Sequence, residues 1–306
     1  MIPTLVFCIF EEIYFVTRLA EPDLIVNADG SVYHLCMKPE DLSENIIVVG
    51  DPNRVGEISS RFQYVEHHAC NREFISATGY YKDKRITALS TGIGTDNIDI
   101  VMHELDALVN FNLGTRQQHP VRKSVNIIRI GTSGSIQPDV PVNTYGLATH
   151  AIGLDNLLYF YKGMDRVIDQ EMTRSFLQQT DWHPGLSKPY FVEGSRKLIR
   201  KFLGEAVSGI TVTAPGFYGP QGRRLNLDLT DPAMLRKLQE FSYEGRRIVN
   251  FEMETSALYG LGALMGHHMV TICAIIANRV TGIYVADHKQ LIEGLIDLVL
   301  EKITGD

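Results

Sequence analysis

The stretch V-N-I-I-R-I-G-T-S-G-S-I at residues 125–136 indicates the class of fold. Ile127, Ile128 and Ile130 form a short apolar, β-branched run, which a series of glycines and small residues then closes. This pattern is typical of a buried central strand that opens into a small-residue loop. Arg129 interrupts the run with a permanent charge, and burying an unpaired charge is very costly. An internal carboxylate, an exposed strand face or a bound anion must therefore account for it.

The composition limits the class of protein. The chain has 306 residues, of which 44% are apolar and 21% are charged, as in a soluble globular protein with an ample core. This length allows one large α/β domain or two ordinary ones. The formal net charge of −7 argues against a nucleic-acid-binding protein, which should be basic. Any bound anion is therefore expected to meet a local cluster of arginines.

The cysteines and the first residues of the chain bear on its location. Cys8, Cys36, Cys70 and Cys273 show neither a metal-ligand spacing nor the density of a disulfide scaffold, so we expect reduced thiols in the cytoplasm. The apolar residues 1–10 lack the basic start and the cleavage site of a signal peptide, and they are too few for a membrane span. We therefore expect no membrane partner.

Apolar strand patterns alternate with helical patterns along the rest of the chain. Strands are expected at 46–50 and 269–277, and an amphipathic helix is expected at 291–300. This alternation predicts a single-domain three-layer α/β/α fold with a mixed, mostly parallel central sheet. No linker or internal repeat divides the chain, so we expect residues 1–25 to be an extension outside the fold and 26–306 to form one domain.

Polar side chains follow the predicted strands, at the ends where parallel α/β sheets bind their ligands. Arginines beside glycine-containing turns suit phosphate, because the guanidinium fork matches phosphate oxygens. A glutamine and an arginine two residues apart suit a planar ring, and a glutamate at a helix start suits sugar hydroxyls. Phosphate, sugar and base together indicate cleavage of a nucleoside by phosphate. The side chains expected to converge on this rim are Arg54, Arg129, Gln221, Arg223, Glu254 and Arg279.

The sequence resembles the uridine phosphorylases of the nucleoside phosphorylase-I superfamily over nearly all of the chain after Ser31. Each matching motif is weak by itself, but the motifs follow one another in order at family-like spacing. The resemblance implies a nucleoside phosphorylase-like fold and phosphorolysis of uridine to uracil and ribose 1-phosphate. The motifs are S-V-Y-H-L at 31–35, V-V-G-D-P-N-R-V at 48–55, N-R-E-F at 71–74, S-T-G-I-G at 90–94, I-I-R-I-G-T-S-G at 127–134, G-F-Y-G-P-Q-G-R at 216–223, N-F-E-M-E at 250–254 and N-R at 278–279.

The resemblance also implies three groups of substrate contacts, built on a homodimer in which Arg72 and His34 come from the neighbouring subunit. The phosphate contacts that it implies are Gly50, Arg54, Arg72, Arg129 and Thr132. The ribose contacts that it implies are His34, which would hold the 5′-hydroxyl, and Glu252, Met253 and Glu254. The base contacts that it implies are Phe217, Gln221, Arg223 and Arg279.

The implied reaction is an inverting attack of phosphate on C1′ of the nucleoside, with an oxocarbenium-like transition state that is stabilised electrostatically. Phosphate is the co-substrate, and no metal or other cofactor is expected. Glu73 and Ile93 match relatives that hold a monovalent cation at the dimer interface, but Asn97 replaces their serine and argues against this cation. The side chains implied to act in catalysis are Arg129, Gln221, Arg223 and Glu254.

Alternative functions differ in the base or in the reaction. Purine-specific relatives carry Ser-Asp where this chain has Asn278 and Arg279, so a purine nucleoside phosphorylase is the second hypothesis. A nucleosidase that uses water is the third, and the intact set of arginines counts against it. A non-catalytic binding or storage protein is the fourth, disfavoured by the complete set of polar residues. The sequence leaves open a dimer or a hexamer, and a preference among uridine, deoxyuridine and thymidine.

Overall fold

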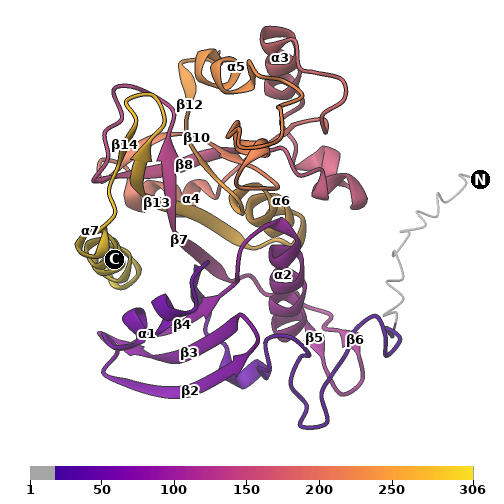
Figure 1. The fold of residues 1–306 in the computed structure, drawn as a ribbon. Coiled ribbons are helices and arrows are strands. Elements are labelled where there is room, and N and C mark those ends of the chain that lie inside the picture. The colour runs from indigo at the N-terminus through magenta and orange to yellow at the C-terminus, as the bar shows by residue number, and fades with distance from the viewer. Residues whose placement is uncertain (1–17, 306) are drawn as a thin grey trace, which may run out of the picture.

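The computed structural model describes residues 18–305 and shows a large sheet with helices on both of its faces (Figure 1). The strands of this part of the chain are β1 (Asn45–Val49), β2 (Tyr64–Asn71), β3 (Phe74–Tyr81), β4 (Lys84–Ser90), β5 (Phe111–Asn112), β6 (Gln117–Gln118), β7 (Asn126–Ser135), β8 (Thr144–Gly153), β9 (Tyr190–Glu193), β10 (Val207–Thr213), β11 (Ser242–Tyr243), β12 (Arg246–Glu252), β13 (His268–Asn278) and β14 (Ile283–Tyr284). The α-helices are α1 (Asn53–Ser59), α2 (Thr95–Asn110), α3 (Gln170–Thr180), α4 (Arg196–Phe202), α5 (Met234–Glu240), α6 (Thr255–Met265) and α7 (Lys289–Thr304).

The large sheet has the strand order β11-β12-β10-β8-β13-β7-β1-β4-β3-β2, with β9 paired to β8 and β14 to β13. Parallel pairs join β4, β1, β7 and β13 in one run and β8, β10 and β12 in another. Antiparallel pairs include β2 with β3, β3 with β4 and β13 with β8. The mixed α/β sheet predicted from the sequence is thus confirmed, and antiparallel pairs take a larger share of it than the strand patterns indicated.

One further pairing closes part of the sheet on itself. The end of β12 pairs antiparallel with the end of β7, with Asn250 opposite Ser135 and Phe251 opposite Gly134. Because β12 is also connected to β7 through β10, β8 and β13, these five strands form a closed ring. The ring brings the last residues of β12 next to the glycine-containing end of β7, although more than a hundred residues separate them in the sequence.

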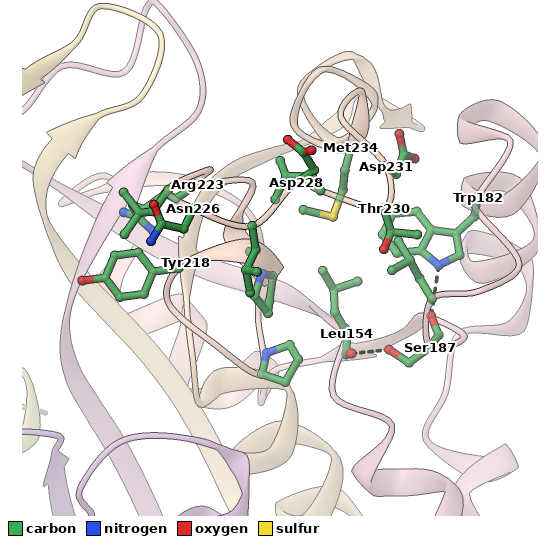
Figure 2. Close-up of a pocket in the computed structure, with 17 residues that line it drawn as sticks. Leu154, Trp182, Ser187, Tyr218, Arg223, Asn226, Asp228, Thr230, Asp231 and Met234 are labelled. Atoms are coloured by element: carbon green, nitrogen blue, oxygen red, sulfur yellow. Dashed lines mark hydrogen bonds between the residues drawn. The ribbon is translucent and has the colours of Figure 1, made fainter.

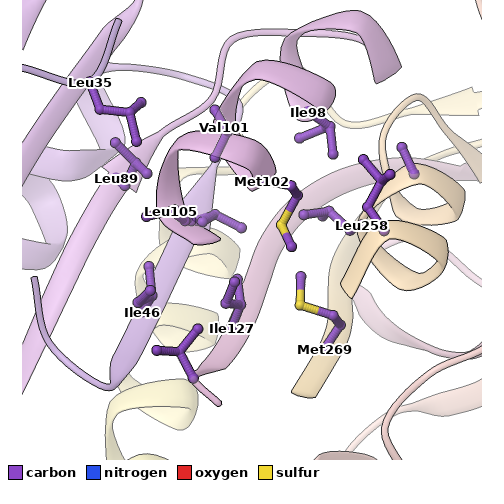
Figure 3. Close-up of a cluster of buried hydrophobic side chains, with 14 of the residues drawn as sticks. Leu35, Ile46, Leu89, Ile98, Val101, Met102, Leu105, Ile127, Leu258 and Met269 are labelled. Carbon is purple, nitrogen blue, oxygen red and sulfur yellow. The ribbon is translucent and has the colours of Figure 1, made fainter. Parts of the chain in front are cut away.

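The helix α2 covers one face of the sheet with a stripe of buried side chains. These recur at intervals of three and four residues, which places them on a single side of the helix. Figure 3 shows them beside side chains of β1, β4, β7 and α6. Fully burying one such large aliphatic side chain contributes about 1.5–3 kcal/mol to folding. The side chains labelled in this cluster include Ile98, Val101, Met102 and Leu105 of α2, Ile46, Leu89 and Ile127 of the sheet, and Leu258 of α6.

The opposite face of the sheet is covered by α1, α4 and α7. The apolar stripe of α7, which includes Leu295 and Val299, packs in one cluster with Ile47 of β1 and Ile130 of β7. The helix predicted at 291–300 is found within α7. Helices on both faces confirm the three-layer α/β/α architecture. Within residues 18–305, no helix is both long enough and apolar enough to cross a bilayer.

The predicted N-terminal extension lies mostly in residues 1–17, outside the described residues. Residues 18–25, however, are not outside the fold. Leu24 is buried in the main core cluster, and Arg116 Nε donates a hydrogen bond of 3.0 Å to the Leu24 carbonyl. The predicted boundary at residue 25 is therefore wrong for this segment, because an apolar side chain there contributes to the core.

Candidate active site

Arg129 lies in β7 with only 5% of its surface exposed. Its guanidinium forms ion pairs with two carboxylates that follow one another where β12 ends and α6 begins. Arg129 Nη1 lies 3.2 Å from Glu252 Oε2, and Arg129 Nη2 pairs with Glu254 Oε2. The pairing of β12 with β7 makes this contact possible. Internal carboxylates thus meet Arg129 in this structure, which is one of the alternatives left open by the sequence.

The two carboxylates share one buried guanidinium, so the cluster carries an excess of negative charge. Burial raises the pKa of Glu254 to about 6; Arg129 opposes this shift, and the neighbouring Glu252 adds to it. Burial by itself would lower the pKa of Arg129, but Glu254 and Glu252 raise it. Arg129 is therefore the cation that keeps a buried carboxylate pair compatible with the fold.

Besides its ion pair with Arg129, Glu252 also holds the start of α6. Its carboxylate accepts hydrogen bonds from the backbone N–H of Glu254 (2.9 Å), the backbone N–H of Thr255 (3.0 Å) and the hydroxyl of Thr213 (2.6 Å). The first N–H groups of a helix have no partner within the helix, and a carboxylate satisfies them well. Glu254 is held on its other oxygen by the backbone N–H of Gly94 at 2.8 Å. Protein donors thus contact both oxygens of Glu252 and both oxygens of Glu254, and Glu252 accepts the larger number of hydrogen bonds.

In the residues after Arg129, the backbone lies close to the Arg129 side chain. A Cβ atom at Gly131 would lie 2.2 Å from Arg129 Nη1, so only glycine leaves room for the guanidinium. The strand does not end at Gly131 as the pattern predicted; β7 continues to Ser135, because this segment pairs with β13 and β12. Ser133 is buried, and its hydroxyl has no hydrogen-bond partner among the described residues. Sequence reasoning missed Ser133, since only burial distinguishes it from other serines in small-residue loops.

Arg54 supplies a second guanidinium to the same region. It lies in the first turn of α1, which follows the end of β1 by three residues. Burial lowers its pKa, Asp51 raises it, and the nearby charge of Arg129 lowers it. Within residues 18–305, Arg54 forms no ion pair of its own. Its donors are therefore available to an anion, whereas both terminal nitrogens of Arg129 already contact carboxylates and only its Nε is left without a partner among the described residues.

The turn 216–223 after β10 carries the predicted base contacts. Arg223 Nη1 donates hydrogen bonds to Gln221 Oε1 (2.5 Å) and to the Phe217 carbonyl (2.6 Å). The Arg223 guanidinium carbon lies 3.9 Å from the centre of the Phe217 ring, as in a cation–π contact. Arg279 Nη1 donates to the Gln221 carbonyl at 3.0 Å. Burial, followed by repulsion from Arg279, lowers the pKa of Arg223 to about 10.

A single cavity of about 500 Å³ brings most of the predicted side chains together. Arg279, a predicted base contact, does not line this cavity but donates a hydrogen bond to the carbonyl of Gln221, which does. Within residues 18–305, no group of three or more His, Cys, Asp or Glu side chains is arranged to hold a metal ion. The predicted residues that line this cavity are Gly50, Arg54, Arg129, Thr132, Phe217, Gln221, Arg223, Glu252, Met253 and Glu254.

Arg72 and His34 do not line this cavity. Arg72 has a positive φ of 55° and lies 5.9 Å from the centre of the Tyr33 ring. His34 is held by Glu104, whose Oε1 lies 2.6 Å from His34 Nδ1. Neither side chain therefore contributes to the cavity of its own chain. Their implied roles in the site of a neighbouring subunit stay predictions.

A second cavity of about 600 Å³ lies on the other side of the turn that carries Gln221 and Arg223. Figure 2 shows Tyr218 and Arg223 on one side of it and Trp182 and Ser187 on the other. Trp182 Nε1 donates to the Ser187 carbonyl at 3.0 Å. Arg223 lines both cavities. No sequence pattern indicated this second cavity, because its walls come from segments that are far apart in the chain.

Several known proteins are similar to this chain. A family model described as the phosphorylase superfamily matches residues 44–296. A uridine phosphorylase of Thermococcus kodakarensis is 30% identical over 255 residues, which cover 83% of this chain and 79% of that protein. A purine nucleoside phosphorylase of Caldanaerobacter subterraneus is 27% identical over 252 residues, which cover 81% of this chain and 89% of that protein.

Solved structures show the same similarity. A Trypanosoma brucei nucleoside phosphorylase, described as showing uridine phosphorylase activity, matches with a TM-score of 0.84 and 30% identity. The match covers 93% of this chain and 100% of that one. A uridine phosphorylase of Phytophthora capsici matches with a TM-score of 0.68, but at 19% identity this likeness concerns the fold alone.

Proposed function

The chain belongs to the phosphorylase superfamily, and on this premise we propose that it is a uridine phosphorylase, a pentosyltransferase that converts uridine and phosphate to uracil and ribose 1-phosphate. The observation that carries the proposal is the shared cavity, which is lined by Gln221 and Arg223 of the turn 216–223 together with Arg54 of α1 and Arg129 of β7. The similar uridine phosphorylases support the choice of base. The purine alternative is supported by purine nucleoside phosphorylases that are 27% and 28% identical to this chain, below the 30% of the Thermococcus uridine phosphorylase.

Phosphate is proposed to bind between Arg54, Thr132 and Gly50, beside Arg129. The free guanidinium of Arg54 and the backbone N–H groups near Gly50 suit a dianion. Held there, phosphate would lie on one side of C1′, and its charge would stabilise the positive charge that develops on the ribose. Phosphate itself is the nucleophile, so this mechanism needs neither a covalent enzyme intermediate nor a further cofactor.

The departing uracil takes up negative charge. The turn 216–223, called the base turn below, is proposed to stabilise this charge. Because Gln221 Oε1 already accepts a hydrogen bond from Arg223, the amide nitrogen of Gln221 and the remaining nitrogens of Arg223 are the groups left to face the base. These groups are donors, and uracil presents carbonyl acceptors to them. Arg279 adds positive charge next to the turn. Donors fixed where charge develops provide most of the stabilisation in such reactions.

Glu254 is proposed to hold the ribose hydroxyls. Glu252 is proposed to position the start of α6 and the guanidinium of Arg129, rather than to contact the ribose. Met253, between them, is partly exposed to the cavity. The free cysteines Cys36, Cys70 and Cys273 support the cytoplasm as the location of the enzyme.

Cleavage of uridine is expected to depend strictly on phosphate. The reason is that Arg54, in the wall of the cavity, offers free donors to an anion. The measurement follows uridine and inosine by ultraviolet absorbance, each with and without phosphate, and identifies ribose 1-phosphate as a product. Equal cleavage of uridine without phosphate would indicate a nucleosidase, and faster cleavage of inosine would indicate a purine phosphorylase.

The active site is further proposed to include Arg72 and His34 of the neighbouring subunit. Arg54→Ala and Arg72→Ala proteins are expected to be nearly inactive alone. After unfolding and refolding as a mixture, half of the dimers combine the two chains, and one of the two sites in each of these is intact. About a quarter of the wild-type activity should therefore return.

The matched control mixes Arg54→Ala with Arg223→Ala, two lesions that line the same cavity of one chain. This mixture should recover no activity, because every site keeps one lesion. A lack of recovery in the first mixture, with mixed dimers shown to have formed, would contradict the shared site.

A further inference from the structure

The hairpin of β13 and β14 contributes to the wall of the cavity of about 500 Å³, which is called the substrate cavity below. Hydrogen bonds of one buried side chain hold this hairpin in place. Asn278, at the end of β13, is buried, and its Nδ2 donates hydrogen bonds of 2.9 Å to the carbonyls of Gln137 and Val140. Asn278 Oδ1 accepts 2.9 Å hydrogen bonds from the backbone N–H groups of Val280 and Thr281. A single buried amide therefore fixes the turn between the two strands.

The register of this hairpin determines which side chain faces the cavity. Tyr284 of β14 pairs with Ala277 of β13, and Ile283 pairs with Asn278. Side chains of directly opposite residues lie on the same face of a sheet. Ala277 and Tyr284 both line the substrate cavity, whereas Ile283 does not. Successive residues of a strand point to opposite faces, which accounts for the difference.

Tyr284 lines the same cavity as the turn 216–223, which is proposed to bind the base. Arg279, on the same hairpin, donates to the carbonyl of Gln221 in the base turn. Phe217 and Arg223 of that turn line the same cavity as Tyr284. Although it lines a cavity, Tyr284 is 65% exposed, so a large aromatic surface is left without a protein partner there. Aromatic surface of this kind in a pocket is typical of a ligand contact.

We propose that Tyr284 is a further base-binding residue, whose ring packs against the pyrimidine and adds to the contact of Phe217. This inference rests on the proposed function, since it takes the base to be uracil. Flat π faces stack on aromatic side chains without hydrogen bonds, so the contact would add affinity while Gln221 and Arg223 supply recognition. The hairpin would then be part of the base site, held in place by Asn278.

The test compares three variants in equilibrium binding of uracil in the presence of phosphate. Tyr284→Ala should weaken uracil binding about tenfold, which corresponds to about 1.4 kcal/mol at 25 °C. Tyr284→Phe keeps the ring and should bind uracil as the wild type does. Ile283→Ala is the matched control, because it removes a similarly exposed apolar side chain from the same hairpin on the face away from the cavity. Its uracil affinity should be unchanged.

Kinetics separate a base contact from a general disturbance of the site. For Tyr284→Ala, the KM for uridine should rise while the KM for phosphate stays unchanged. Unchanged uracil binding in Tyr284→Ala, or an equal loss in Ile283→Ala, would overturn the assignment. The wild-type protein distinguishes this result from failure of the proposed function: if it neither binds uracil nor cleaves uridine, the function is wrong, whereas a wild type that does both leaves the outcome to Tyr284 alone.

Discussion

Replacement of Arg129 by alanine is expected to lower the free energy of unfolding by about 3–5 kcal/mol, the usual cost of removing one partner from a buried ion pair. The substitution leaves Glu252 and Glu254 buried next to each other without their cation. Activity should fall to background, because Arg129 positions Glu254 and borders the proposed phosphate site. The measurement is denaturant unfolding followed by circular dichroism, together with the uridine assay.

The pH dependence of this variant gives an independent check. The pKa of Glu254 is already raised to about 6 with Arg129 present, and loss of the arginine removes the main effect that opposes this shift. Protonation of Glu254 removes buried negative charge, so the stability deficit should shrink as the pH falls through 6 and grow above it. A deficit that is the same at low and neutral pH would contradict the role assigned to the carboxylate pair.

Arg247→Ala is the matched control for stability. Arg247 pairs with Asp139 through Nη2 and Oδ2 at 2.5 Å, but the two side chains are 40% and 60% exposed. Exposed pairs of this kind contribute about 0–1 kcal/mol. If Arg247→Ala destabilised the protein as much as Arg129→Ala, burial of the Arg129 cluster would not be the cause.

Replacement of Arg223 by alanine is expected to reduce kcat/KM for uridine by about 10²–10³-fold, the effect of removing one fixed donor to a developing anion. Arg223 is charged, lines the substrate cavity and orients Gln221 through its bond to Oε1. The fold should keep its stability, because Arg223 is only half-buried on a surface turn. The measurement is steady-state kinetics with uridine and phosphate varied separately.

Arg224→Ala provides the control for this result. Arg224 is the next residue in the chain, its side chain is 70% exposed, and it pairs with Asp228 at 2.7 Å away from the substrate cavity. Its removal should leave kcat/KM unchanged. Near-normal uridine turnover in Arg223→Ala, or an equal loss in Arg224→Ala, would show that the base turn has been assigned wrongly.

Local patterns in the sequence were sufficient for much of the fold. The β-branched run around Ile128 is fully consistent with a buried strand, and the stripe at 291–300 is consistent with a helix on the sheet. Because the carboxyl ends of parallel strands share one edge, the polar residues that follow these strands could be expected to meet. The structure places Arg54, Arg129 and Gln221 around one cavity as this rule indicates.

The partners of Arg129 show what local patterns could not determine. Its charge in an apolar run required an anionic partner, yet an internal carboxylate and a bound anion satisfy that requirement equally well. The carboxylate partners depended on the antiparallel contact of β12 with β7, which brings Glu252 and Glu254 to a strand more than a hundred residues earlier. The N-terminal boundary was missed for a similar reason, since Leu24 is buried only by residues distant in the chain.

The sequence by itself determined which segments become strands and helices and which chemical groups stand at their ends, because side-chain periodicity and backbone preferences act over a few residues. Tertiary structure alone decided how distant groups are placed: Glu252 anchors α6, Tyr284 lines the same cavity as Gln221, and Arg72 does not line the cavity of its own chain. Such contacts follow from strand pairing and loop closure between distant segments, and no local pattern encodes them.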